Sequence, residues 1–149
     1  MALFKLLHIL SVVIWVGGMF FAYMVLRPSA AEILQPPERL RLWDKVFSRF
    51  FNWVWLAVFL LLTSGLYMIY LFGGLGHVAR YVHLMLLLGV VMMLVFMYVY
   101  FICYVRFGLL VADQDWPRAG EMLAVIRKLV AVNLSIGLLT VAVVVIGRG

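Results

Sequence analysis

The chain has 149 residues, of which 68% are hydrophobic and only 12% charged, with a formal net charge of +6. Soluble domains average roughly 45–50% apolar and about 25% charged residues, so this composition excludes a water-soluble globular fold. The basic residues gather in two connecting segments and not along one face of a soluble helix, so no nucleic-acid partner is expected. The length suits one domain, residues 1–149. The single cysteine, Cys103, excludes an internal disulfide and a CxxC metal site.

Four apolar runs predict four membrane-spanning helices, at about residues 6–26, 51–72, 81–105 and 129–146. Each reaches or approaches the roughly 20 residues that cross about 30 Å of hydrocarbon, and a helix is the form that such runs take in lipid. The first run is too long for the hydrophobic region of a signal peptide and has no clear small-residue cleavage site. The predicted fold class is all-α, an integral membrane four-helix bundle.

An amphipathic lead-in helix is predicted before the second span, at about residues 37–50. Pro36, Pro37 and Glu38 suit the first turn of a helix. Apolar side chains then recur at helical spacing while basic side chains lie off that line, which is typical of a helix at the membrane surface. A similar segment with Pro117 precedes the fourth span.

The distribution of basic residues predicts the orientation. Nine of the 12 Lys and Arg residues lie in the segments 27–50 and 106–128, and three lie on the other side. The positive-inside rule then places both long connections in the cytoplasm and both termini outside. We therefore expect a multi-pass protein of the bacterial inner (plasma) membrane.

A basic-x-x-His pattern opens both the first and the third span. It reads Lys5-Leu6-Leu7-His8 in one and Arg80-Tyr81-Val82-His83 in the other. Each half then has a long connection with a proline in its middle. These shared features suggest a parallel two-helix repeat about an axis along the membrane normal, which would relate His8 to His83.

The two histidines are the candidate metal ligands. An imidazole inside a membrane span is costly and usually has a partner or a ligand. Two of them at one depth suggest the axial ligands of one haem b, with Lys5 and Arg80 near the propionates. Either histidine alone could instead snorkel or bond a neighbouring helix. Further cofactor contacts are predicted on the same helix faces: Ser11, Trp15, Gly18 and Leu87.

Copper is the alternative cofactor. Met93 and Met97 form an i, i+4 pair on the third predicted helix, and thioethers suit Cu(I). They lie about 15–21 Å from His83 by helical rise, too far to share one ion with it. Methionine is also a common apolar filler. Two alternatives to haem therefore stay open: copper transport or homeostasis that uses His8, His83 and these methionines, and a non-catalytic accessory or assembly subunit.

Several short motifs resemble a known family. The segment His8-Ile9-Leu10, followed by Trp15-Val16-Gly17-Gly18-Met19-Phe20-Phe21 and Arg27-Pro28, resembles the first helix of the copper-resistance D (CopD) family. It is also similar to the related HemJ-type membrane proteins, which are linked to protoporphyrinogen oxidation. Tyr81-Val82-His83-Leu84 resembles the start of the HemJ-type pattern aromatic-x-His-x-Lys. The last span is similar too, with Arg127, Asn133 and Gly137-Leu138-Leu139-Thr140.

The resemblance implies a four-helix membrane protein that binds haem b, with His8 and His83 at the family's histidine positions. The HemJ-type lysine is Met85 here. Position i+2 points about 200° away from His83, so haem ligation is compatible with this change, but the oxidase activity associated with that lysine is not carried over. The expected function is one-electron transfer, for example from a quinol, or oxidation of a small membrane-soluble substrate. A homodimer would suit so small a bundle.

Overall fold

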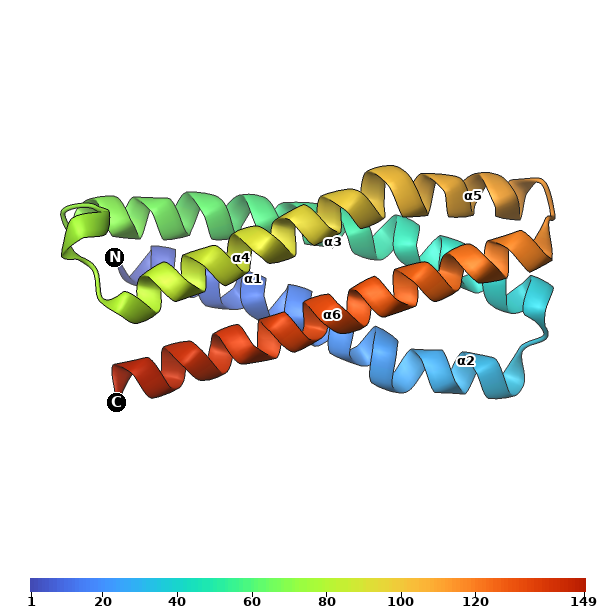
Figure 1. The fold of residues 1–149 in the computed structure, drawn as a ribbon, viewed down its shortest axis with the longest axis horizontal. Helices are drawn as coiled ribbons and strands as arrows, with labels where there is room; N and C mark the ends of the chain where they lie inside the picture. The colour runs from blue at the N-terminus through green and yellow to red at the C-terminus, as the bar shows by residue number, and fades with distance from the viewer.

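The computed structural model describes residues 1–149, and nearly all of them are helical. Four long helical rods lie lengthwise beside one another (Figure 1). The all-α fold class predicted from the sequence is confirmed. The first rod consists of α1 (Ala2–Phe20), η1 (Phe21–Leu26) and α2 (Arg27–Ile33), and the second is α3 (Pro36–Leu71). After the short η2 (Leu75–His77), the third consists of α4 (Arg80–Tyr98), η3 (Val99–Tyr104) and α5 (Val105–Ala112), and the fourth is α6 (Trp116–Arg148).

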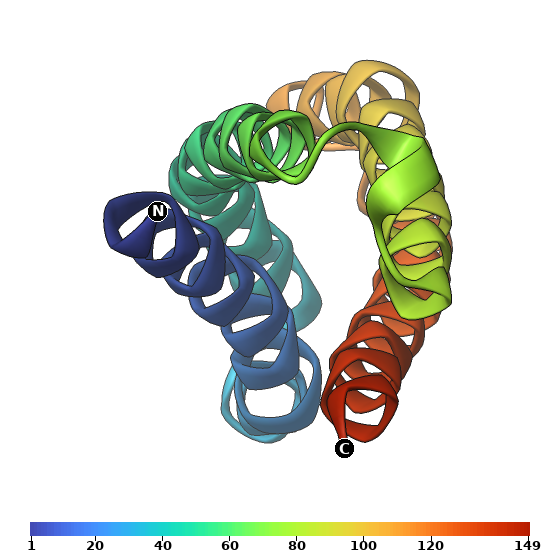
Figure 2. The ribbon, with the colours of Figure 1, turned by 90° about the vertical axis from the view of Figure 1, so that its left-hand side faces the viewer.

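Each rod is long and apolar enough to cross a membrane. The 36 residues of α3 extend about 54 Å at about 1.5 Å per residue, well beyond the roughly 30 Å of hydrocarbon. Both termini lie at one end of the bundle together with the turn between α3 and α4, and the two other connections lie at the opposite end (Figures 1 and 2). The chain is therefore a multi-pass membrane protein.

The ends of the rods follow local sequence signals. Helix α3 begins at Pro36, and α6 has Pro117 in its first turn. The carboxylate of Asp115 caps α6 by accepting a hydrogen bond from the backbone N–H of Arg118. The turn after α3 contains Gly73 and Gly74 at φ +93°, a conformation that glycine adopts without steric cost.

The segment 37–50 is not a separate helix on the membrane surface. It is the first part of α3, and its apolar stripe of Leu40, Trp43 and Phe47 is buried inside the protein. The ring centroids of Phe47 and Phe107 on α5 lie 5.9 Å apart. This part of α3 therefore packs its apolar stripe against protein.

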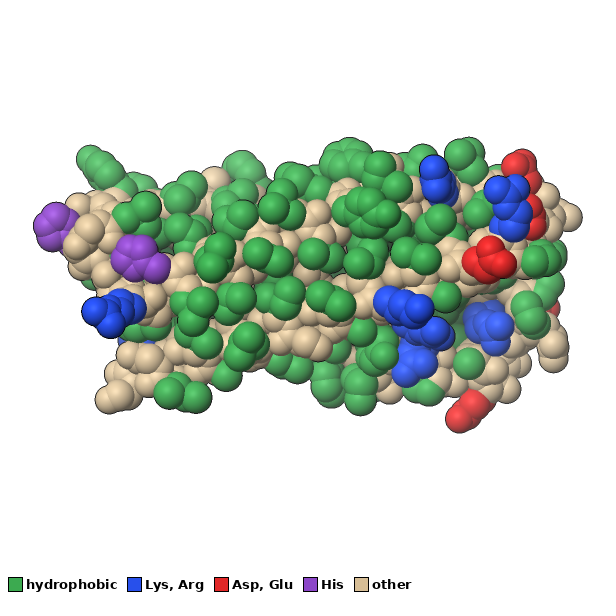
Figure 3. All heavy atoms as spheres, viewed as in Figure 1, with side chains coloured by type: hydrophobic (Ala, Val, Ile, Leu, Met, Phe, Trp, Pro, Cys, Tyr) green, Lys and Arg blue, Asp and Glu red, His purple; other side chains and the backbone are tan.

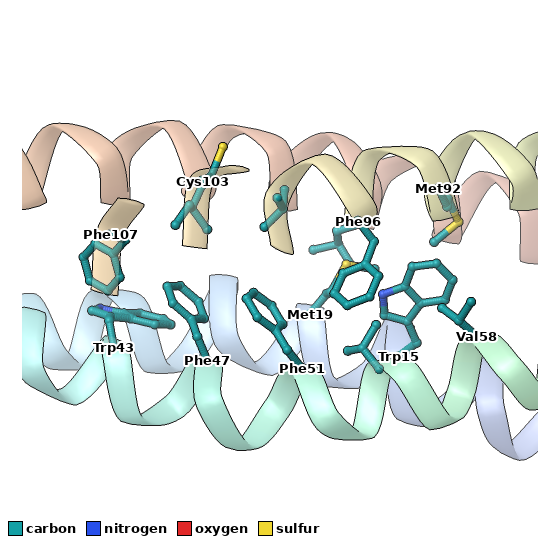
Figure 4. Close-up of a cluster of buried hydrophobic side chains, with 14 of the residues drawn as sticks. Trp15, Met19, Trp43, Phe47, Phe51, Val58, Met92, Phe96, Cys103 and Phe107 are labelled. Carbon is teal, nitrogen blue, oxygen red and sulfur yellow. The ribbon is translucent and has the colours of Figure 1, made fainter. Parts of the chain in front are cut away.

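An aromatic cluster forms the middle of the core and the half that lies away from the termini (Figure 4). Phe51 stacks on Phe47 at 5.1 Å and meets Phe96 and Tyr104 edge to face at 5.5 and 5.2 Å. Trp15 meets Phe96 in the same way at 6.2 Å. Because lipid tails are as apolar as these side chains, such close packing must supply much of the attraction between the helices.

The two halves of the chain share one order of elements. In each half, an α-helix passes through a six-residue π-helical segment, η1 or η3, into a second α-helix. A connection and a long helix with proline in its first turn then follow. Single π-helical turns are rare, so their matched placement is consistent with the predicted two-helix repeat.

Candidate functional site

A cavity of about 480 Å³ lies in the half of the bundle that carries the termini, between α1, α3, α4 and α6. We call it the His8 cavity. Its walls are mostly hydrophobic, and His8 and Arg148 are the only titratable side chains that line it. Gly137 on α6 forms part of its inner end, where an added Cβ would lie only 2.9 Å from Val16 Cγ2.

His8 is held in a defined orientation by α3. Its Nδ1 lies 3.1 Å from the hydroxyl oxygen of Ser64. That hydroxyl donates its own proton to the carbonyl of Leu60, so the oxygen accepts a hydrogen bond from Nδ1–H. Nε2 is then the nitrogen with the free lone pair. Metal-ligating histidines are commonly fixed by such a bond through the other ring nitrogen.

Gly65 makes room for the imidazole of His8. A Cβ at this position would lie 3.3 Å from His8 Cε1, which is tighter than ordinary van der Waals contact. Ser64 and Gly65 are neighbours on α3, so one turn of this helix supplies both the hydrogen bond and the space. Together, Ser64 and Gly65 hold the imidazole of His8 in one orientation.

His83 does not line the His8 cavity. It is exposed on α4, and its Nδ1 lies 3.2 Å from the carbonyl oxygen of Ala79 one turn earlier. Leu87, predicted on the same face, is 59% exposed. Met85, two residues after His83, lines the cavity instead, because residues two apart on a helix point about 200° from each other. The structure therefore does not bring the two predicted haem ligands into one cavity.

The two cations predicted near the propionates also lie elsewhere. Lys5 and Arg80 are exposed and do not line the His8 cavity. The cation that does line it is Arg148, at the end of α6. Sequence reasoning missed this residue because nothing in the local sequence places the last turn of the fourth helix beside the first.

The residues of the first helix that were predicted to contact a cofactor lie partly at the cavity and partly in the packed core. Trp15 is buried and lines the cavity. Ser11 is buried and donates to the carbonyl of Leu7 at 2.8 Å. Gly18 lies deeper, where the ring of Phe50 fills the space that a side chain would take. Ser11 and Gly18 thus serve helix packing in this structure.

Three thioethers line the His8 cavity from α4: those of Met85, Met92 and Met93. Their i, i+7, i+8 spacing places them on one helix face, a signal that the sequence contained. Met97, the partner predicted for Met93, is 42% exposed and does not line the cavity. The separation along the helix that argued against a shared copper site was measured from His83. It does not apply to His8, which lines the same cavity as Met85, Met92 and Met93.

No cluster of three or more His, Cys, Asp or Glu side chains that could hold a metal ion is present in the structure. The soft donors that line the His8 cavity are one imidazole and three thioethers, and no carboxylate lines it. Such a ligand set excludes the oxygen-rich coordination that Mg²⁺ and Ca²⁺ require.

Comparison with protein-family models gives a match to CopD, copper resistance protein D, over residues 44–146. The match runs from the first third of α3 to the last turns of α6 and so includes the thioethers of the cavity, while His8 precedes it. The expected likeness to HemJ-type proteins is not confirmed. No curated protein and no solved structure matches. Because the matched region covers most of the chain, this membrane protein belongs to the copper resistance protein D family.

Proposed function

We propose that this protein is a copper-handling membrane protein that binds copper(I) in the His8 cavity. One observation carries the proposal: the imidazole of His8, with Nε2 free, and the thioethers of Met85 and Met93 line the same cavity. Imidazole and thioether are suitable ligands for copper, and thioethers select the cuprous ion in particular. Membership of the copper resistance protein D family supports the choice of metal.

The chemistry of the cavity favours the cuprous over the cupric ion. No carboxylate or thiol lines it, whereas Cu(II) prefers tetragonal sites of nitrogen and oxygen ligands. A cation within an apolar membrane cavity is costly unless ligands replace its water. Neutral soft donors can do so without adding a buried negative charge. The charge pattern supports a place in the bacterial inner membrane, with the cavity open to copper from the outer side.

The test is the affinity of the detergent-purified full chain for Cu(I), measured anaerobically against a chromophoric Cu(I) chelator. His8→Ala and the double variant Met85→Leu/Met93→Leu should each bind at least about tenfold more weakly, since two soft ligands or the only imidazole are lost. His77→Ala and Met97→Leu are matched controls, because neither residue lines the cavity. Equal affinity in all four variants would reject the proposed site.

Haem b is a second candidate ligand, favoured by the size of the cavity. A copper ion needs far less than about 480 Å³, and the mostly hydrophobic walls suit a large flat ligand. The residues present fit a haem held by His8 alone, with Arg148 available to a propionate. His83, Lys5 and Arg80 do not line the cavity. Bound haem would supply one-electron chemistry toward a quinol or another small membrane-soluble substrate, in a membrane oxidoreductase.

A larger side chain inside the cavity should distinguish haem from copper as the ligand. No heavy atom lies within 4 Å of a Cβ built at Gly89, and Gly89 lines the cavity, so Gly89→Leu should narrow it without distorting α4. If haem is the ligand, the variant should lose the Soret band seen in oxidised and dithionite-reduced spectra of the parent protein. If copper is the ligand, Cu(I) binding should persist. Parent protein without metal affinity or colour would contradict both and favour an accessory subunit.

A further inference from the structure

A second cavity, of about 320 Å³, is lined by three arginines and no acidic residue. It lies in the half of the bundle away from the termini, which the distribution of basic residues predicts to be cytoplasmic. Arg27 comes from α2, Arg39 from α3 and Arg127 from α6. None of them forms an ion pair, since the one ion pair of the structure joins Arg118 to Asp115. Three arginines therefore line this cavity, with no acidic side chain in its walls and no ion pair to the rest of the chain.

The arginines are available to a ligand. Arg27 donates a hydrogen bond from Nε to the carbonyl of Tyr23 at 3.1 Å, and its guanidinium lies 4.5 Å from the centroid of that ring. These contacts hold the side chain in place while its terminal NH₂ groups make no hydrogen bond to the chain. The side chains of Arg39 and Arg127 make none either. The donors of all three groups can therefore bind an anion.

The remaining walls of the arginine cavity are mostly apolar. Aromatic side chains of α3 and α6 form one part of them: Trp43, Phe47, Phe50, Phe51 and Trp116. An inorganic anion would use only the arginines, whereas such walls suit a hydrocarbon chain. Figure 3 shows basic side chains gathered around a hollow near this end of the molecule, beside the broad hydrophobic belt. The cavity thus combines a cationic rim with an apolar interior at the level of the inner membrane interface.

We propose that this arginine cavity binds an anionic phospholipid of the inner leaflet, with its phosphate among Arg27, Arg39 and Arg127 and an acyl chain along the aromatic wall. Basic pockets between transmembrane helices on the cytoplasmic side suit anionic headgroups. The planar guanidinium group pairs with two phosphate oxygens at once. The negative charge of the lipid phosphate offsets part of the repulsion between the three arginines, and the lipid connects α2, α3 and α6. This site is separate from the His8 cavity and does not depend on copper or haem.

The test compares two variants that lose the same charge on the same side of the membrane. Arg27→Gln/Arg39→Gln/Arg127→Gln removes the arginines of the cavity. Arg49→Gln/Arg106→Gln/Lys128→Gln removes three exposed cations that do not line it. The detergent-purified full chain is titrated with phosphatidylglycerol, phosphatidylcholine or inorganic phosphate and observed by native mass spectrometry and by its thermal midpoint.

Phosphatidylglycerol should bind the cavity variant roughly 100-fold more weakly than the parent. Each arginine makes one interfacial charge contact worth about fivefold in affinity, and three are lost. The control should lose less than about threefold, because none of its three side chains lines the cavity and only the screened charge of this face changes. Phosphatidylcholine should bind all three proteins weakly, and inorganic phosphate should not displace phosphatidylglycerol.

Two outcomes would overturn the proposal. Equal loss of phosphatidylglycerol affinity in both triple variants would show that only the net charge of this face matters. Displacement of the lipid by inorganic phosphate would assign the cavity to a soluble anion. If the cavity variant fails to fold, Arg127→Gln alone provides the test, since this side chain is exposed; it should weaken phosphatidylglycerol binding about fivefold, and an unchanged affinity would reject the proposal.

Discussion

The Nδ1 atom of His8 on α1 lies 3.1 Å from the hydroxyl oxygen of Ser64 on α3. Because Ser64 donates its proton to Leu60, the hydroxyl oxygen accepts from the imidazole, and Nε2 is the nitrogen left for a ligand. The two residues are 56 positions apart in the chain. Their contact arises from the pairing of the first two rods.

Ser64→Ala should lower the Cu(I) affinity by about 10–100-fold without abolishing it, because the imidazole stays but loses the bond that orients it. Competition with a Cu(I) chelator measures the effect. Ser135→Ala is the matched control, since Ser135 makes the same type of bond to the carbonyl four residues earlier but is exposed. An unchanged affinity in Ser64→Ala would show that Ser64 does not position the ligand.

His83→Ala should leave ligand binding within about twofold of the parent protein, because substitution of an exposed side chain away from a site has little effect. His8→Ala should lose the ligand. Bound copper per chain and the Soret region of the absorption spectrum report both possible ligands in one preparation. A loss in His83→Ala as large as that in His8→Ala would favour the paired ligation predicted from the sequence.

Phe51→Ala should lower the free energy of unfolding by about 3–5 kcal/mol, as expected for a large buried aromatic residue. Phe51 is 3% exposed and contacts aromatic rings of α3, α4 and η3. Phe59→Ala is the control on the same helix, at a residue that is 63% exposed. Unfolding in mixed detergent micelles measures both. Similar losses in the two variants would contradict the central role of the aromatic cluster.

Gly137→Ala should destabilise the protein by about 1–3 kcal/mol through overpacking. A Cβ there would lie 2.9 Å from Val16 Cγ2 and 3.2 Å from Met92 Cε, so these side chains or the helices that carry them must shift. Gly120→Ala, also on α6, meets no atom within 4 Å and should be neutral or stabilising by up to about 1 kcal/mol from helix propensity. Thermal midpoints in detergent compare the pair, and a stabilising Gly137→Ala would contradict the close approach of these helices.

The class of fold could be predicted because the bilayer imposes strict demands on the backbone. A chain with four long apolar runs must form helices in lipid. Pro36 and Pro117 indicate where two of these helices begin. The π-helical segments could not be predicted, since neither η1 nor η3 has a distinctive sequence. The burial of the apolar stripe within residues 37–50 could not be predicted either, because it depends on contacts with neighbouring helices such as α5.

By itself, the sequence determined four membrane-spanning helices. It also predicted their orientation from the charge pattern and His8 as a candidate ligand. The tertiary structure decided that Met85 and not His83 lines the cavity with His8. In a soluble helix an apolar stripe reveals which side is buried. Helix α4 is apolar around most of its circumference, since lipid and protein interior are both nonpolar. Periodicity therefore could not reveal its inward face, and only the packing against α6 fixed it.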